Sequence, residues 1–284
     1  MTDPSDRTKL YLATYPRDFV SPEDAIDTHV VGSYRPLTPP LGAETSIACI
    51  GSCFAGEIAA ELTAQGRAVA HMSLSERWNT PQALAHFLRY AMNGVPFPDG
   101  FLPQDFKLES DLYQTQLSNA DAFIMTLGLS VVWTETETGK MVLEPRLGHS
   151  GKGLMAAVRG TYVMRQLDLY EIEAEISASI ECIRSAKPNA PIILTLSPIP
   201  FLVSFTPQPP IPSNIISKAA LRLALHNIWE QKYPDVYYWP AYDIVEWRAK
   251  YDRIYGTGED DARHIKRSVV TDIMSRFSAL YIRL

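Results

Sequence analysis

The sequence predicts an α/β fold: a three-layer α/β/α sandwich around a mainly parallel sheet. Short apolar runs at Thr45–Ile50, Ala122–Leu127 and Ile192–Leu196 each stop at a glycine or serine, as buried parallel strands often do. Segments with apolar residues at helical spacing lie between them, at Phe54–Gln65 and Ile172–Ile183. Strands that alternate with helices in this way predict a parallel sheet covered on both faces.

Local signals predict the other elements. Thr80 followed by Pro81 is typical of a helix start, and Gly94 of its end. Val131–Thr136 and Lys140–Leu143 predict a hairpin that turns at Thr138 and Gly139. The remaining predicted elements are helices at Ser217–Gln231 and Ile265–Leu280 and a strand at Val236–Trp239, with loops at Pro198–Pro212 and Tyr242–Gly258.

The composition disfavours several classes of protein. The 284 residues are 46% hydrophobic and 20% charged, with a net charge of -6 and no basic cluster, so we expect no nucleic-acid partner. The three cysteines form no CxxC or Cys/His cluster, which argues against structural zinc and favours a reducing compartment.

The chain shows no signal for a membrane or for secretion. It has no apolar stretch of about 18 residues, and its first residues lack the basic and then apolar pattern of a secretory signal. We therefore expect a cytoplasmic protein without a membrane span. Residues 1–44 are irregular and contain several prolines, so they are predicted to form an N-terminal arm, with residues 45–284 as the main domain.

Ser52 is the strongest candidate for chemistry. It lies between a buried strand and a helix N-terminus, where ligands of open parallel sheets bind and where backbone N–H groups point outward. Taken alone, a serine here is more typical of a helix N-cap than of a nucleophile. The neighbouring Cys53 is an alternative nucleophile.

A serine nucleophile needs a base, and His264 fits best among the six histidines. It follows Asp261 by three residues, just before the last predicted helix. A carboxylate at that spacing can hold the second imidazole N–H and stabilise the imidazolium formed during attack. The alternative is that His264 caps the helix while Asp261 is an exposed acid.

Four blocks of sequence, in order, resemble the GSCFA family. They are Gly51–Ala55, Thr126–Ser130, Thr195–Pro200 and Asp261–His264, and the resemblance spans roughly residues 45–280. This family is similar to the SGNH (GDSL-type) hydrolases and acyltransferases. The resemblance implies their flavodoxin-like α/β/α fold, with Ser52 as nucleophile and Asp261 and His264 as the activating pair.

The resemblance also implies an oxyanion hole. Gly128 matches the glycine of the Gly-x-Asn-Asp block, so its backbone N–H and that of Ser52 are expected to bind the oxyanion. The sequence departs from that block, because Ser130 stands in place of the asparagine and Val131 in place of the aspartate. Ser130 and Asn79 are alternative candidates for the side-chain donor.

The implied activity is that of a serine esterase acting through an acyl-serine intermediate on a small or carbohydrate-linked ester. The alternatives are an O-acyltransferase that modifies a polysaccharide or glycan hydroxyl, and a non-catalytic SGNH-fold binding module. The departures at Ser130 and Val131 motivate the binding module. None of these activities requires a metal or another cofactor.

Overall fold

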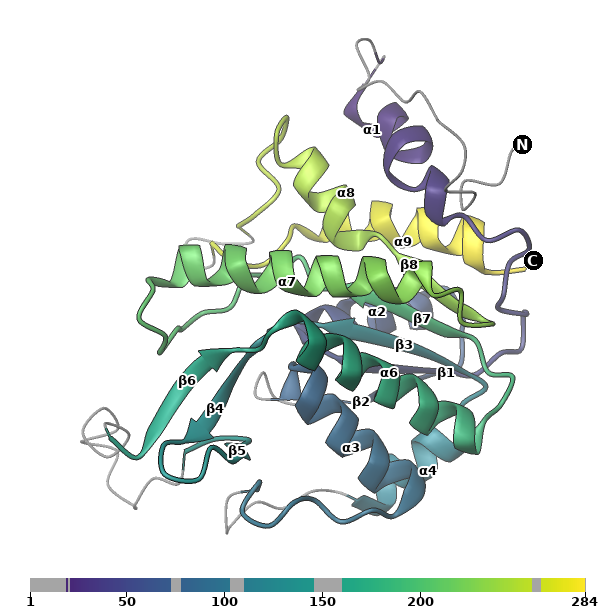
Figure 1. Cartoon of the computed structure of the whole chain (residues 1–284). Coiled ribbons are helices and arrows are strands. Elements are labelled where there is room, and N and C mark those ends of the chain that lie inside the picture. Colours follow the sequence, from purple (N-terminus) through teal and green to yellow (C-terminus); the bar gives the residue numbers. More distant parts are fainter. Residues whose placement is uncertain are drawn as a thin grey trace, which may run out of the picture.

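A five-stranded parallel sheet forms the centre of the protein (Figure 1). The structure, a computed structural model, describes residues 19, 21–72, 78–102, 110–145, 160–256 and 262–283. The strands are, in spatial order, β2 (Val69–Met72), β1 (Ile47–Gly51), β3 (Ala122–Leu127), β7 (Ile192–Leu196) and β8 (Val236–Trp239). This is the flavodoxin-like order, in which the sheet changes its direction of growth between β1 and β3.

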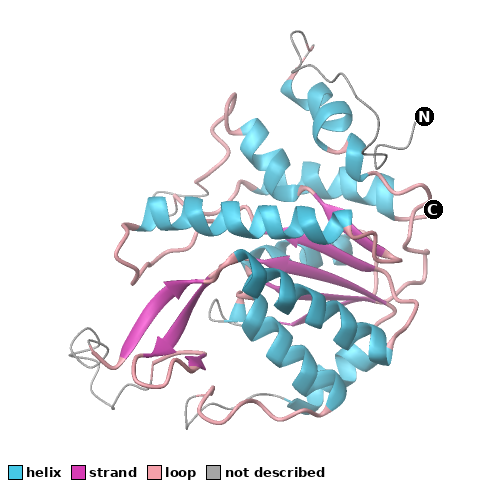
Figure 2. Cartoon of the chain, in the orientation of Figure 1, coloured by secondary structure: helices cyan, strands magenta, loops and turns pink. Residues whose placement is uncertain are grey.

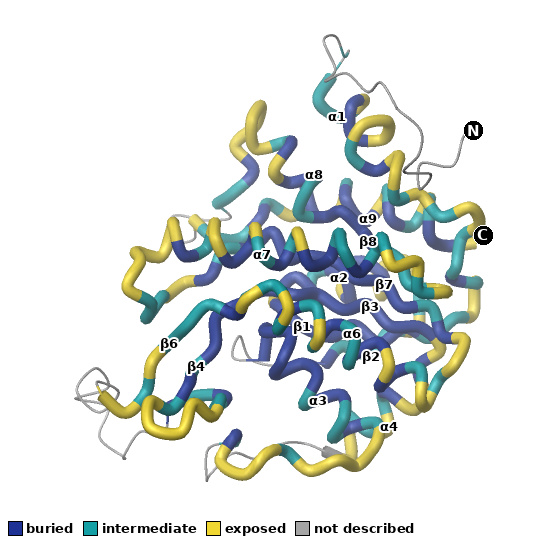
Figure 3. Tube along the Cα trace, in the orientation of Figure 1, coloured by how far each residue is buried: buried dark blue, intermediate teal, exposed yellow. Residues whose placement is uncertain are grey.

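Alternate residues of the strands face two separate cores. In β1, Ile47 and Cys49 belong to one core, and Ala48 and Ile50 to the other. The first core is covered by α2 (Cys53–Ala64), α8 (Ala241–Arg248) and α9 (Arg267–Tyr281), and the second by α3 (Pro81–Asn93), α6 (Leu169–Ala186) and α7 (Pro210–Glu230). Figures 2 and 3 show the strands buried between these helices. The predicted three-layer sandwich is confirmed.

Local sequence sets the ends of two helices that frame the functional region. The hydroxyl of Ser52 caps α2, and that of Thr80 caps α3, where Pro81 takes the first helical position. Gly94 ends α3 in a left-handed conformation with φ of 66°. These predicted starts and stops are confirmed, because short polar side chains satisfy the unpaired N–H groups of a first turn.

A second, smaller sheet extends from the carboxyl end of β3 (Figure 2). It consists of β4 (Val131–Glu135), β5 (Met141–Val142) and β6 (Tyr162–Gln166), all antiparallel. The hairpin of β4 and β5 was predicted from the sequence, whereas β6 was not.

Two segments that were predicted as loops are partly helical. Helix α7 begins at Pro210, not at Ser217, because proline is tolerated in a first helical turn. Helix α8 (Ala241–Arg248) occupies the first part of the stretch predicted as a loop at 242–258. Helix α4 (Ser110–Ser118) and strand β2 were not predicted from the sequence.

Residues 21–44 pack against the face formed by α8 and α9. The Trp247 indole N–H donates to Pro22 O at 2.9 Å, and Tyr281 Oη donates to Tyr34 O at 3.1 Å. Leu41 is fully buried and bridges to Ile282. The division into an arm (1–44) and a domain (45–284) stays a prediction. Within the described ranges, no helix combines the length and the apolar character that a membrane span requires.

Candidate active site

Ser52 lies at the turn between β1 and α2, at the point where the growth of the sheet reverses. Its side chain is only 4% exposed, and its Oγ accepts a hydrogen bond from Phe54 N–H at 3.3 Å. The serine is therefore the N-cap that its position suggests. Capping uses an acceptor site of the hydroxyl and leaves its proton available to a base, so the capping role and a nucleophilic role are compatible.

Gly51 makes this turn possible. Its φ is 122°, and a Cβ at this position would lie 2.1 Å from Thr126 O of the adjacent strand. A residue with a side chain would be both strained in its backbone and in collision with β3. The glycine thus lets the chain leave the sheet abruptly and start α2 with Ser52 at the sheet edge.

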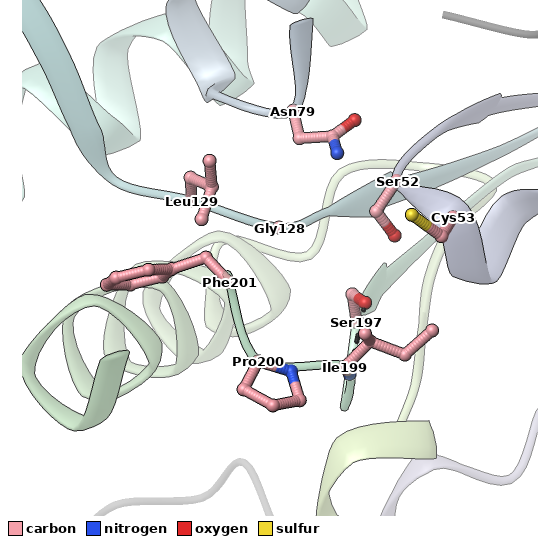
Figure 4. A pocket seen from close by; sticks show the side chains of 9 residues that line it. All are labelled: Ser52, Cys53, Asn79, Gly128, Leu129, Ser197, Ile199, Pro200 and Phe201. Carbon is pink, nitrogen blue, oxygen red and sulfur yellow. Dashed lines mark hydrogen bonds between the residues drawn. The ribbon is translucent and has the colours of Figure 1, made fainter. Parts of the chain in front are cut away.

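Ser52 opens into a small pocket at the carboxyl ends of β1, β3 and β7 (Figure 4). The pocket is narrow, with a cavity volume of about 20 Å³. It is lined by Ser52, Cys53, Asn79, Gly128, Leu129, Ser197, Ile199, Pro200 and Phe201. Such an edge is where open α/β sheets bind ligands, and the walls of this pocket combine polar and apolar side chains.

Gly128 brings the three segments of the pocket into contact. A Cβ at Gly128 would lie 3.0 Å from Asn79 Cβ and 3.3 Å from Ser52 Cβ. The N–H groups of Gly128 and Leu129 both donate to Asn79 O at 3.0 Å. Asn79 and Ser52 can therefore approach each other across a residue without a side chain.

Replacing Gly128 by alanine should impair the pocket more than the fold. The added methyl group must push Asn79 or Ser52 away by a few tenths of an ångström. Because a displacement of about 1 Å near reacting atoms lowers kcat by about 10²-fold, this smaller shift should lower kcat by roughly threefold to tenfold. Ester-hydrolysis kinetics and melting temperature measure the two effects. Gly32→Ala is the control, because its Cβ would meet only Asp27 O at an ordinary 3.5 Å. Equal kcat values for Gly128→Ala and the control would contradict this role.

Asn79 presents a hydrogen-bond donor to the pocket. The side chain is 5% exposed, and its Oδ1 is buried without a hydrogen-bond partner among the described residues. Figure 4 shows the amide nitrogen turned toward Gly128 and Ser52 and the oxygen turned away. Of the two predicted side-chain donors, Asn79 is the one that the structure brings next to Ser52.

The structure does not bring Ser130, the other predicted side-chain donor, next to Ser52. Ser130 is fully buried and does not line the pocket. Its Oγ donates to Ser217 and accepts a hydrogen bond from the Gln166 amide, while its N–H donates to Ser217 Oγ at 2.8 Å. Ser130 therefore joins the start of β4 to α7 and β6, which explains why a serine at this position does not face a substrate.

The expected backbone donors are also engaged. Ser52 N–H donates to Thr126 O at 3.2 Å, and Gly128 N–H donates to Asn79 O at 3.0 Å. Both groups hold the polypeptide segments together in this conformation, so neither is free to bind an oxyanion. Of the expected donors to the oxyanion, the side-chain amide of Asn79 therefore remains as the candidate.

His264 lies in a short turn that is tied to the pocket loop. Tyr255 and Ile265 form an antiparallel bridge, and Gly256 N–H donates to His264 O at 2.9 Å. Tyr255 Oη donates to Pro198 O at 3.2 Å, between the pocket residues Ser197 and Ile199. Burial raises the pKa of Tyr255, with the nearby Glu246 as a further cause, so the phenol keeps its proton for this bond.

Of the two predicted partners of Ser52, the structure describes His264 but not Asp261. His264 is half-buried and is not among the described residues that line the pocket around Ser52. The roles of His264 and Asp261 therefore stay predictions.

The contacts of one buried residue behind the pocket, Lys218, were not predicted from the sequence. The sequence predicted that its helix begins at Ser217, but Ser217 and Lys218 both lie well inside α7. Lys218 is 1% exposed and donates to Gly128 O and Ser197 O at 2.8 and 2.7 Å. The available signal was a lysine at helical spacing with Leu221 and Leu225, since lysine is almost never buried without partners.

The family assignment rests on a match over most of the chain. The profile of the GSCFA family matches residues 98–277. The chain belongs to the GSCFA family. The matched region includes Gly128, Ser197 and His264 but not the Gly51–Ala55 block, so the resemblance seen in the sequence is confirmed independently of that block.

Comparison with other proteins adds similarities in structure. A comparison with curated proteins finds no match. Among solved structures, this GSCFA protein is similar to a salicylyl-acyltransferase from a tetracycline biosynthetic pathway, with 12% identity and a TM-score of 0.40 over 85% of this chain. It spans 57% of the length of that acyltransferase.

Two esterases show similarity at the same level of identity. One is an acetyl esterase mutant with acetate ion, with 12% identity and a TM-score of 0.37 over 84% of this chain and 92% of that one. The other is a carbohydrate esterase family 3 from Talaromyces cellulolyticus, with 12% identity, a TM-score of 0.35 and the same coverage of both chains.

Proposed function

We propose that this GSCFA protein is a serine-dependent acyl hydrolase or O-acyltransferase that forms an acyl-serine intermediate at Ser52. The observation that carries the proposal is the position of Ser52: a nearly buried hydroxyl at a strand-to-helix turn, in a pocket with the Asn79 amide close by. This combination of an alcohol and an adjacent N–H donor suits acyl transfer, in which negative charge develops on the attacked carbonyl oxygen.

In the proposed reaction, Ser52 Oγ attacks the carbonyl carbon of an ester while His264 accepts the hydroxyl proton. Asp261 orients the imidazole and stabilises its protonated form. The Asn79 amide donates to the oxyanion of the tetrahedral intermediate. As that intermediate collapses, the ester C–O bond breaks, and His264 returns the proton to the leaving alcohol.

The second half of the reaction removes the acyl group from Ser52. Water attacks the acyl-serine in an esterase, whereas the hydroxyl of an acceptor attacks it in a transferase. His264 again takes the proton of the attacking group and returns it to Ser52 Oγ. Ile199, Pro200 and Phe201 form the apolar wall of the pocket, and we expect a short acyl chain to lie against them. The acyl donor is proposed to be a small or carbohydrate-linked ester.

Turnover of short-chain acyl esters tests this proposal. We expect saturable hydrolysis of acetyl and butyryl esters by the purified protein, and transfer of the acyl group when a sugar acceptor is present if the protein is a transferase. Hydrolysis that is unchanged by acceptors would favour the esterase. Absence of turnover, together with failure to react with a fluorophosphonate, would contradict both activities.

Asn79→Ala should lower kcat by about 10²- to 10³-fold, because a donor to the oxyanion acts mainly in the transition state. KM should change much less. Leu129→Ala, which alters the apolar lining of the same pocket, is the control and should mainly affect KM. If both variants changed KM alone, Asn79 would be a binding group and not an oxyanion donor.

A non-catalytic binding module is the second candidate. The N–H groups of Ser52 and Gly128 favour it, because both are hydrogen-bonded to backbone carbonyls. The oxyanion hole therefore has fewer donors than acyl transfer through a serine ester normally uses. A binding module should retain ligand affinity in Ser52→Ala and form no acyl-enzyme. Trapping of an acyl adduct on the wild-type protein would exclude this candidate.

A further inference from the structure

Lys218 is a buried cation directly behind the candidate active site. It lies on α7, is 1% exposed, and is among the largest fully buried side chains of the described residues. Its ammonium donates to Gly128 O at 2.8 Å and to Ser197 O at 2.7 Å. Burial of an ammonium group is unfavourable unless hydrogen bonds compensate for the loss of water, so these two contacts are a specific feature of the site.

The two acceptors belong to the walls of the pocket. Gly128 follows β3 and Ser197 follows β7, and both line the space into which Ser52 opens. The adjacent Ser217 contacts the same region, because its Oγ accepts from Ser130 N–H at 2.8 Å. Helix α7 thus fixes the polypeptide after β3 at two points and joins it to the end of β7.

A chain of hydrogen bonds leads from Lys218 to Asn79. The peptide group between Gly128 and Leu129 accepts from Lys218 through its carbonyl and donates to Asn79 O through the Leu129 N–H, at 3.0 Å. Bonds in such a series polarise one another, so the charged donor at one end strengthens the bond at the other. The backbone that carries the Asn79 amide is therefore held by the ammonium group of Lys218.

We propose that Lys218 is a positioning residue for acyl transfer: it holds the Gly128–Leu129 peptide and the Ser197 carbonyl so that the Asn79 amide stays beside Ser52. This inference rests on the proposed function of Ser52 and Asn79. Without Lys218, the two pocket walls lose their common partner, and the amide leaves the position where the oxyanion forms. The loss falls on kcat, because the oxyanion exists only after the substrate has bound.

The test compares Lys218→Met with Leu225→Ala. Methionine keeps the apolar volume but has no donor, and Leu225 is an equally buried residue two turns further along α7. Amide hydrogen exchange of the peptide that carries Gly128 and Leu129 is measured together with kcat, KM and melting temperature. We expect Lys218→Met to raise exchange at this peptide about tenfold and to lower kcat about 10- to 100-fold, with KM within threefold.

The control separates positioning from general stability. Leu225→Ala should lower the melting temperature at least as much but leave kcat within about twofold, with unchanged exchange at Gly128 and Leu129. Lys218→Arg, which retains the charge and donors, should recover part of the kcat lost in Lys218→Met. A folded Lys218→Met with wild-type exchange and wild-type kcat would overturn the inference.

Two further results distinguish failure of this inference from failure of the proposed function. If Lys218→Met does not fold, exchange in the wild-type protein decides: Gly128 and Leu129 amides that exchange as fast as exposed loop amides would overturn it. If the wild-type protein neither hydrolyses esters nor labels at Ser52, the proposed function fails. Increased exchange in Lys218→Met would then still support the structural link from Lys218 to Asn79.

Discussion

Ser52→Ala should lower kcat for ester hydrolysis by about 10⁴- to 10⁶-fold, the range expected when a nucleophile that acts together with a base is removed. The alanine variant should remain folded, because the loss of an N-cap hydroxyl costs only about 1 kcal/mol. Initial rates under saturating substrate, with stability checked by urea denaturation, measure both quantities.

Cys53→Ala is the matched control for this experiment. Cys53 is exposed, adjacent to Ser52 and part of the same pocket. If Ser52 is the nucleophile, Cys53→Ala should retain kcat within about threefold, since it removes a thiol with no role in the reaction. A large loss in Cys53→Ala combined with a small loss in Ser52→Ala would move the nucleophile to the thiol.

Gly51→Ala should destabilise the fold by about 3–5 kcal/mol or prevent folding. The methyl group would lie 2.1 Å from Thr126 O, and the φ of 122° adds backbone strain. The shift in the free energy of unfolding is measured by urea denaturation. β1 and β3 would have to separate at the edge where Ser52 lies, so we expect any folded variant to be inactive as well.

Gly66→Ala distinguishes this collision from backbone strain alone. Gly66 has a φ of 79° and nothing within 4 Å of its Cβ position, so its substitution should cost only about 1 kcal/mol. If Gly51→Ala and Gly66→Ala lowered the free energy of unfolding equally, the close approach of Thr126 would not be the reason why position 51 requires glycine.

The layers of the fold were predictable because buried strands have a strong sequence signal. The strands at 122–127 and 192–196 are continuous apolar runs, and β3 and β7 coincide with them. By contrast, β6 has the sequence YVMRQ, in which polar and apolar residues mix without alternation and no residue is fully buried. Helix α7 was placed seven residues late because Pro210 and Pro212 were interpreted as breakers, although the first turn of a helix tolerates proline.

The residues of the site that directly follow a strand could be predicted from the sequence. Ser52 and Gly128 directly follow adjacent parallel strands, so their proximity follows from the topology. Ser130 is only two residues further, yet its side chain is buried against α7, which no local pattern indicates. The contacts of Lys218 behind the pocket were missed for the same reason, because they join it to Gly128 and Ser197, which are distant in sequence.

The most direct test asks whether the His264 imidazole activates the Ser52 hydroxyl. It uses fluorophosphonate labelling with peptide mapping, applied to the wild-type protein and to His264→Ala. The account predicts a single adduct on Ser52 in the wild-type protein and a labelling rate at least about 10³-fold lower in His264→Ala. An adduct on Cys53, no adduct, or an unchanged rate in His264→Ala would contradict it.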